Sequence, residues 1–77
     1  MNTTRSELLH TITSPRGTIV RMFWNPGSTW TNPVYELIWP GYCSEWRVAF
    51  GATERIHALR TLVKMRRGTD PWTGCSI

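Results

Sequence analysis

Four side chains near the C-terminal end of the chain could bind an anion together. His57, Arg60, Lys64 and Arg67 recur at intervals of three and four residues, the spacing that brings side chains onto one face of an α-helix. A helix here would carry a continuous basic strip able to contact phosphate groups or acidic side chains. The alternative interpretation is a solvated helix face whose terminal cations complement the helix dipole.

Two of the five tryptophans are the best candidates for a binding anchor. Trp30 lies in the loop segment STWTN and Trp72 lies in the C-terminal tail, so neither fits the alternation of a predicted strand. An exposed indole near cations can stack on a nucleobase or anchor a protein interface. The alternative is that both indoles fold back over a small core. The other three, Trp24, Trp39 and Trp46, are predicted to pack in that core.

The sequence contains no set of residues spaced for catalysis. Its five acidic residues form no evident acid–base pair, and it has neither a nucleophile elbow nor a phosphate-binding glycine loop. Cys43 and Cys75 are not a C-x-x-C pair, and adding His10 and His57 gives no zinc-finger spacing. We therefore predict a binding protein and not an enzyme, with no cofactor and no metal. The cysteines are predicted to be idle thiols, with a disulfide pinning the tail as the alternative.

Length and composition predict one small domain. The chain has 77 residues, 40% of them hydrophobic, which argues against disorder. We expect residues 1–77 to form a single domain with loosely packed ends at 1–6 and 69–77. The formal net charge of +4 favours acidic partners such as nucleic acid or an acidic protein surface. No apolar run approaches the roughly 18 residues of a membrane span, and the first ten residues lack a signal-peptide core, so the prediction is a cytoplasmic protein without a membrane partner.

Turn residues divide the chain into short β-rich segments. Proline and glycine mark turns at 14–17, 25–28 and 40–42. Between them, residues 7–13, 18–24, 34–39 and 46–50 are predicted strands, and their spacing predicts an antiparallel meander.

One face of this predicted sheet is almost entirely apolar, and the other mixes apolar residues with single charges. The mixed face would hold a ladder of Arg21, Glu36 and Arg47, and both arginines are secondary candidates for binding. Either the N-terminal segment or a partner would cover that face.

The segment 53–68 has the start and stop signals of a helix. Thr53 is the predicted N-cap, and Gly68 is predicted to end the helix in a left-handed conformation. Two apolar stripes run along this helix. We expect the first to cover the sheet; it consists of Ala52, Ile56, Leu59 and Val63. The second is predicted to extend the core, or alternatively to contact a partner or a second copy; it consists of Ala58, Leu62 and Met65. The expected class is therefore α+β: a sheet of three to four strands covered on one face by a single C-terminal helix.

The segments PVYELI, WRVAF and GATERIHALRTL resemble, in order, the last strands and the helix of double-stranded-RNA-binding domains. The architecture is also similar to the sheet and helix of integrase arm-binding domains. Both resemblances imply nucleic-acid binding through the helix. As a whole, the short tryptophan-rich α+β chain resembles small accessory proteins of phages and mobile elements, including anti-CRISPR inhibitors. That resemblance implies an inhibitor that blocks a larger protein or nucleoprotein, in the host cytoplasm if a phage encodes it.

Two functions are therefore predicted as alternatives. The first is a small inhibitor or regulator that docks on an acidic protein surface, with the basic strip providing charge complementarity and the two tryptophans providing buried area. The second is a nucleic-acid-binding module that uses the same strip, with Arg21 and Arg47 contributing from the sheet. A weaker third alternative is a homodimer through the outer face of the sheet.

Overall fold

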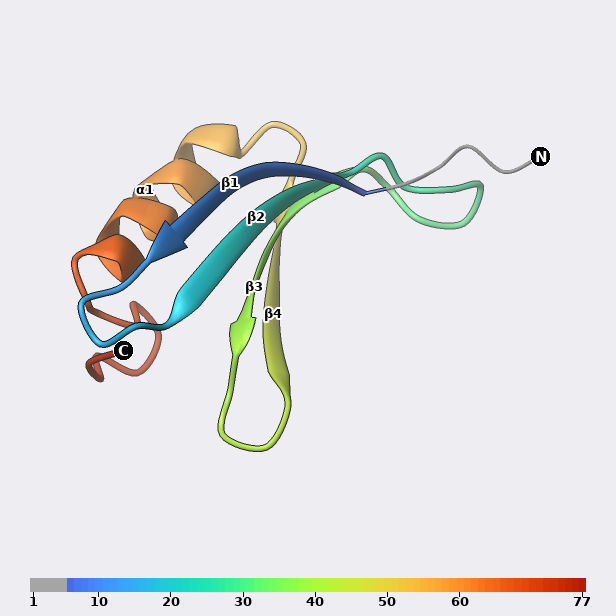
Figure 1. The fold of residues 1–77 in the computed structure, drawn as a ribbon. Helices are drawn as coiled ribbons and strands as arrows, with labels where there is room; N and C mark the ends of the chain where they lie inside the picture. Colours follow the sequence, from blue (N-terminus) through green and yellow to red (C-terminus); the bar gives the residue numbers. More distant parts are fainter. Residues whose placement is uncertain (1–5) are drawn as a thin grey trace.

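The structure is a computed structural model that describes residues 6–77, which form a four-stranded antiparallel sheet with one α-helix packed on it (Figure 1). The elements, in chain order, are β1 (Glu7–Thr13), β2 (Ile19–Asn25), β3 (Val34–Pro40), β4 (Glu45–Gly51) and α1 (Arg55–Arg66). The strand order in the sheet is β1-β2-β3-β4. The predicted α+β meander with a C-terminal helix on one face is confirmed.

The strand register places large apolar side chains on the face beneath α1. Met22 of β2 lies opposite Leu37 of β3, which lies opposite Val48 of β4. Since side chains alternate along a strand, residues two positions away point to the same face. The buried core joins this face to the helix and consists of Val20, Met22, Leu37, Trp39, Ala58, Leu62 and Met65.

β1 is an edge strand with a bulge. It is the outermost strand beside β2, and its register shifts between Leu8 and His10. The extra residue, Leu9, packs against the core, whereas Leu8 and His10 are exposed. A bulge re-aims a side chain in this way because two residues oppose one on the partner strand. β1 therefore contributes Leu9 and Ile12 to the core and leaves its outer edge without a neighbouring strand in residues 6–77.

The β3–β4 hairpin is built around Trp46. The Gly41 N–H donates to the Ser44 carbonyl at 2.7 Å, which closes the turn. The Trp46 ring lies so close to Gly41 that a Cβ at this position would overlap it. This close approach requires glycine at position 41.

Replacing Gly41 by alanine should displace the Trp46 ring. We expect Gly41→Ala to lower the free energy of unfolding by about 1–2 kcal/mol, because a half-exposed indole loses part of its packing. Urea unfolding followed by circular dichroism measures this loss, and tryptophan fluorescence reports on the ring. Gly51→Ala is the matched control, because nothing lies within 4 Å of a Cβ added there. Equal losses in the two variants would contradict the packing of Trp46 on Gly41.

The helix starts later than the sequence predicts. The prediction of Thr53 as the N-cap is wrong: the N-cap is Glu54, whose side chain makes no capping hydrogen bond. The cause is the short connection from β4. The Glu54 N–H donates to the Gly51 carbonyl at 2.9 Å, so the chain turns tightly and the first helical residue is Arg55.

As predicted, Gly68 terminates the helix, whose last residue is Arg66 and whose C-cap is Arg67. This glycine has φ = 107°, in the left-handed region that favours glycine. Its N–H donates to the Met65 carbonyl at 3.0 Å, and the Thr69 N–H donates to the Lys64 carbonyl at 3.2 Å. These two bonds form a Schellman motif, which satisfies carbonyls that the end of a helix leaves unpaired.

The C-terminal segment packs on the domain. Asp70 is buried, and its Oδ1 accepts the N–H groups of Trp72 at 2.9 Å and Thr73 at 3.3 Å. The Ile77 N–H donates to the Gly68 carbonyl at 3.0 Å, and the Ile77 side chain contacts the core. These contacts hold the segment at Asp70 and Ile77, whereas most of its other residues are exposed, and the loosely packed end at 69–77 stays a prediction. The same prediction for residues 1–6 falls, except for its last residue, outside the described residues.

Candidate binding surfaces

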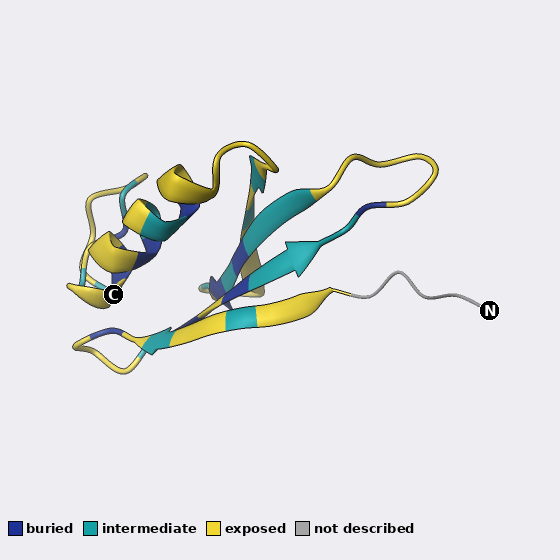
Figure 2. Cartoon of the chain, turned by 90° about the horizontal axis from the view of Figure 1, so that it is seen from above, coloured by how far each residue is buried: buried dark blue, intermediate teal, exposed yellow. Residues whose placement is uncertain are grey.

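One side of α1 packs on the sheet and the other is open to solvent, as Figure 2 shows. Its buried residues are Ala58, Leu62 and Met65. On the solvent side, Ile56 is 62% exposed and Val63 is 45% exposed. The prediction that this stripe covers the sheet is therefore wrong for Ile56 and Val63, and Ala52 lies in the turn before the helix. Leu59, the third helical member of the stripe, is half-buried and packs against the core. The second stripe is the core stripe, as predicted.

The positions of the arginines explain which stripe is buried. At about 100° per residue, four arginines lie within about 75° of the centre of the Ile56–Val63 stripe; they are Arg55, Arg60, Arg66 and Arg67. Only Arg55 and Arg66 lie that close to the centre of the Ala58–Met65 stripe. Burying a cation without a partner is costly. Turning the second stripe inwards leaves more guanidinium groups in water, so this orientation is favoured.

The positive charge of the protein is concentrated on this helix. Residues 54–67 carry five of the nine cationic side chains and one of the five acidic ones, so this segment alone accounts for the formal net charge of +4. The remaining residues of the sequence have equal numbers of cations and acids. Within residues 6–77, the ion pairs involve Arg47 alone among the cations. The helix cations are therefore not neutralised by another residue in that part of the chain.

The four predicted strip residues share one groove. His57, Arg60, Lys64 and Arg67 line an open groove of about 520 Å³ along α1. Its other lining residues are Ile56, Leu59, Thr61 and Val63. The surface thus alternates cations with exposed apolar side chains. This arrangement combines electrostatic attraction with apolar area that a partner can bury.

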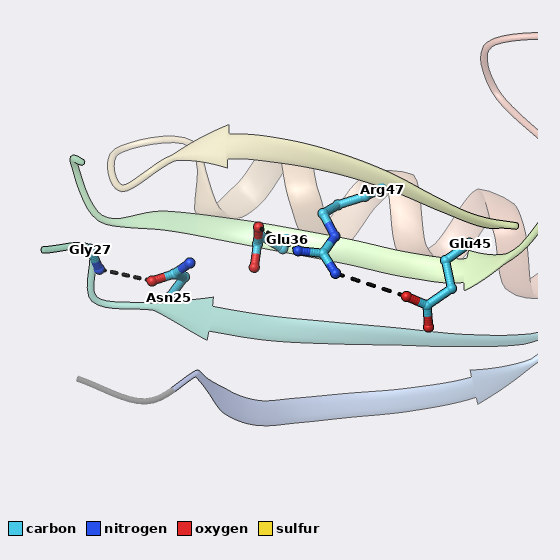
Figure 3. A network of polar contacts seen from close by, with 5 residues as sticks. All are labelled: Asn25, Gly27, Glu36, Glu45 and Arg47. Atoms are coloured by element: carbon cyan, nitrogen blue, oxygen red, sulfur yellow. Dashed lines mark hydrogen bonds and ion pairs between the residues drawn. The ribbon is translucent and has the colours of Figure 1, made fainter. Parts of the chain in front are cut away.

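Arg21 and Arg47 lie on the opposite face of the sheet from α1. Figure 3 shows Arg47 beside Glu36 and Glu45, with the helix behind the sheet. The guanidinium of Arg47 lies 3.8 Å from the Glu36 carboxylate and 3.9 Å from that of Glu45. Arg21 forms no ion pair within residues 6–77, so the predicted three-residue ladder forms only between Glu36 and Arg47. Neither arginine can share a flat contact surface with the strip on α1.

Trp30 is 91% exposed in the β2–β3 loop, which projects away from α1 in both views (Figures 1 and 2). The loop is held by its own hydrogen bonds. The Trp30 N–H donates to Ser28 Oγ at 3.1 Å, and the Ser28 N–H donates to the Thr31 carbonyl at 2.9 Å. Gly27 is buried with φ = 80°, and a Cβ there would collide with the loop backbone. Trp30 is thus presented by an ordered loop, but apart from the basic strip.

Trp72 folds back onto the core. Its ring stacks on that of buried Trp39, with centroids 5.7 Å apart and planes at 12°. The indole of Trp46 also stacks on Trp39, with ring centroids 6.3 Å apart. Trp72 remains 50% exposed, but one ring face is already occupied. Trp72 was predicted either to anchor an interface or to fold back and cover the core, and the packing geometry favours the second interpretation.

The cysteines and histidines are dispersed. Cys43 and Cys75 are free and exposed. The part of the chain that the structure describes holds no group of three or more His, Cys, Asp or Glu side chains placed to bind a metal ion. Among residues 6–77, no helix has the length and apolar character needed to cross a bilayer.

The predicted site residues therefore divide among separate surfaces. Only His57, Arg60, Lys64 and Arg67 are brought together. The sequence prediction did not include Ile56 and Val63 in this surface. The arginines that lie on both sides of the Ile56–Val63 stripe were a signal that this stripe stays exposed. Comparisons with protein-family models, curated proteins and solved structures found no match.

Proposed function

We propose that the protein is a small binding protein without enzymatic activity, which docks through the solvent side of α1 on an acidic surface of a larger partner and blocks it sterically. The observation that carries this proposal is that the segment 54–67 accounts for the whole formal net charge, and that three of its cations, Arg60, Lys64 and Arg67, line one open groove together with exposed Ile56 and Val63. Assignment to the phage accessory inhibitors stays a prediction.

The charge arrangement supports binding over a purely solvated face. Arg60 and Lys64 are four residues apart, and like charges at that spacing destabilise a helix by about 0.2–0.5 kcal/mol. No acidic side chain occurs between Arg55 and Arg67 to offset this repulsion. Such a face costs stability in the free protein, and the cost is recovered when a partner brings carboxylates or phosphates to it.

Exposed apolar residues favour a protein partner over nucleic acid. Protein interfaces combine a dehydrated apolar centre with a polar rim, and Ile56 and Val63 beside Arg60 match that pattern. Nucleic-acid interfaces depend mainly on cations facing phosphates. The five helix cations, which have no ion-pair partners in residues 6–77, still support the nucleic-acid alternative. Arg21 and Arg47 do not support it, because they lie on the opposite face of the sheet from α1.

The proposed function is tested with model anions, because the partner is unidentified. Fluorescence anisotropy measures binding of labelled poly-glutamate and of short DNA and RNA duplexes at low and physiological salt. We expect poly-glutamate to bind wild-type protein at low salt and Arg60→Glu to lose most of this binding. Arg16→Glu, an exposed arginine in the β1–β2 turn, is the matched control and should keep most of it.

Two outcomes would count against the proposal. Loss of binding equally in the Arg16→Glu control would mean that net charge alone matters. Tight, steeply salt-dependent binding of duplexes with no binding of poly-glutamate would favour the nucleic-acid alternative, because phosphate contacts release counterions.

A further inference from the structure

The exposed apolar residues of α1 have the spacing of a coiled-coil seam. Ile56, Leu59 and Val63 are separated by three and four residues, which are the a, d and a positions of a heptad. Ile56 and Val63 are exposed, and Leu59 is half-buried. On this heptad Arg60 and Arg67 occupy e positions, which flank the seam and set the charge of the partner.

A second groove extends this seam towards the edge of the sheet. It has a volume of about 230 Å³ and lies between β1 and α1, lined by Ile12 and Thr11 on the strand and by Leu59 and Val63 on the helix. Leu59 and Val63 line both grooves. The two grooves therefore run along the two sides of one apolar ridge, and β1 has no further strand beside it in residues 6–77.

Resting on the proposed function, we propose that the partner element seated on α1 is an acidic amphipathic helix. Its apolar face would cover Ile56, Leu59 and Val63, and its flanking carboxylates would face Arg60 and Arg67. An amphipathic helix binds a groove through apolar anchor residues at i, i+3 and i+7. The seam residues on α1 have the same spacing.

Charge complementarity excludes a second copy of this chain as the occupant. In an antiparallel pair of α1 helices the e positions face each other, so Arg60 and Arg67 would meet arginines. In a parallel pair Arg60 would face the g position that precedes Ile56, which is Arg55 of the other copy. Like charges across a seam disfavour pairing. A partner must therefore have an apolar face that covers the seam and acidic residues beside it that pair with the exposed cations.

The proposal is tested with designed peptides and anisotropy. The probe is an 18-residue labelled peptide with leucine at a and d and glutamate at e and g. Its control has the same composition in an order that breaks the three-and-four spacing. We expect the heptad peptide to bind and the scrambled peptide to bind far more weakly. Ile56→Gln/Val63→Gln should weaken the heptad complex roughly tenfold or more, because two apolar side chains no longer become buried.

A charge exchange makes the test specific. The Arg60→Glu/Arg67→Glu variant should no longer bind the glutamate peptide. It should instead bind a version of the peptide that has lysine at e and g. Circular dichroism confirms that each variant is folded, which is expected because every substituted side chain is exposed.

The failures of the two proposals are distinguishable. Equal binding of heptad and scrambled peptides would overturn the helix-on-helix inference, while leaving an anion-binding face in place. Binding of duplexes and of neither peptide would overturn it in favour of nucleic acid. Absence of Arg60-dependent binding to every anionic probe at low salt would overturn the proposed function as well.

Discussion

Trp39→Ala is expected to lower the free energy of unfolding by about 3–5 kcal/mol, the range for a buried aromatic residue truncated in a core. Trp39 is buried and lies in contact with two indoles, Trp46 and Trp72. Its removal leaves a cavity and deprives both neighbours of their stacking partner. A 77-residue domain has a total stability of roughly 4–12 kcal/mol at 0.05–0.15 kcal/mol per residue. The loss is therefore a large share of the total stability.

Equilibrium unfolding in urea, followed by circular dichroism at several temperatures, measures this loss. Trp30→Ala is the matched control, because the same side chain is removed from a 91% exposed position and such changes stay within about 0.5 kcal/mol. Similar losses in the two variants would show that Trp39 is not the centre of an indole stack. A Trp39→Ala variant destabilised by about 3–5 kcal/mol beside a native-like Trp30→Ala is the expected pattern.

The strands and the helix were predictable because their signals are local. Proline and glycine mark the turns at Pro15, Pro40 and Gly68, and the period-two pattern between them decides which face of each strand is apolar. The bulge at Leu9 was not predicted, because one inserted residue leaves no signal in the alternation of a seven-residue strand. The N-cap was misplaced because the length of the β4–α1 turn, and not the capping propensity of Thr53, determines where the helix begins.

The rotation of α1 was predictable only in part. The helix has two apolar stripes of similar length, and either could pack on the sheet. Their hydrophobicity alone does not decide which one is buried. The decisive factor is where the arginines fall around the helix axis, since burial of the Ile56–Val63 stripe would bring Arg60 and Arg67 close to the sheet. Counting the flanking charges together with the apolar residues would have predicted the observed orientation. Because Leu59 is half-buried in the structure, the exposed seam remains continuous with the core.

The packing of Trp72 could not be derived from the sequence. The tail 69–77 has no periodicity, and its position depends on contacts with residues distant in the chain, above all Trp39. Asp70 fixes the local turn by accepting two backbone N–H groups. That turn brings the indole back over the sheet. A residue that looked like an interface anchor is thereby used for packing, whereas Trp30 is 91% exposed in the β2–β3 loop.

The binding proposals both depend on the orientation of α1, and two adjacent residues test that orientation directly. Leu62 is buried and Val63 is 45% exposed. Leu62→Asn should lose about 3–5 kcal/mol of stability, because it leaves a cavity and buries an amide without a partner. Val63→Asn should change the stability by about 0.5 kcal/mol or less.

The first measurement is therefore urea unfolding of Leu62→Asn and Val63→Asn side by side with the wild-type protein. The two variants introduce the same residue into the same turn of the helix, and the difference in helix propensity between leucine and valine, less than about 0.7 kcal/mol, is small beside the expected loss. A large loss for Leu62→Asn with a near-native Val63→Asn is the result that this orientation predicts. A larger loss for Val63→Asn would place the Ile56–Val63 stripe against the sheet and contradict both the exposed seam and the partner proposed for it.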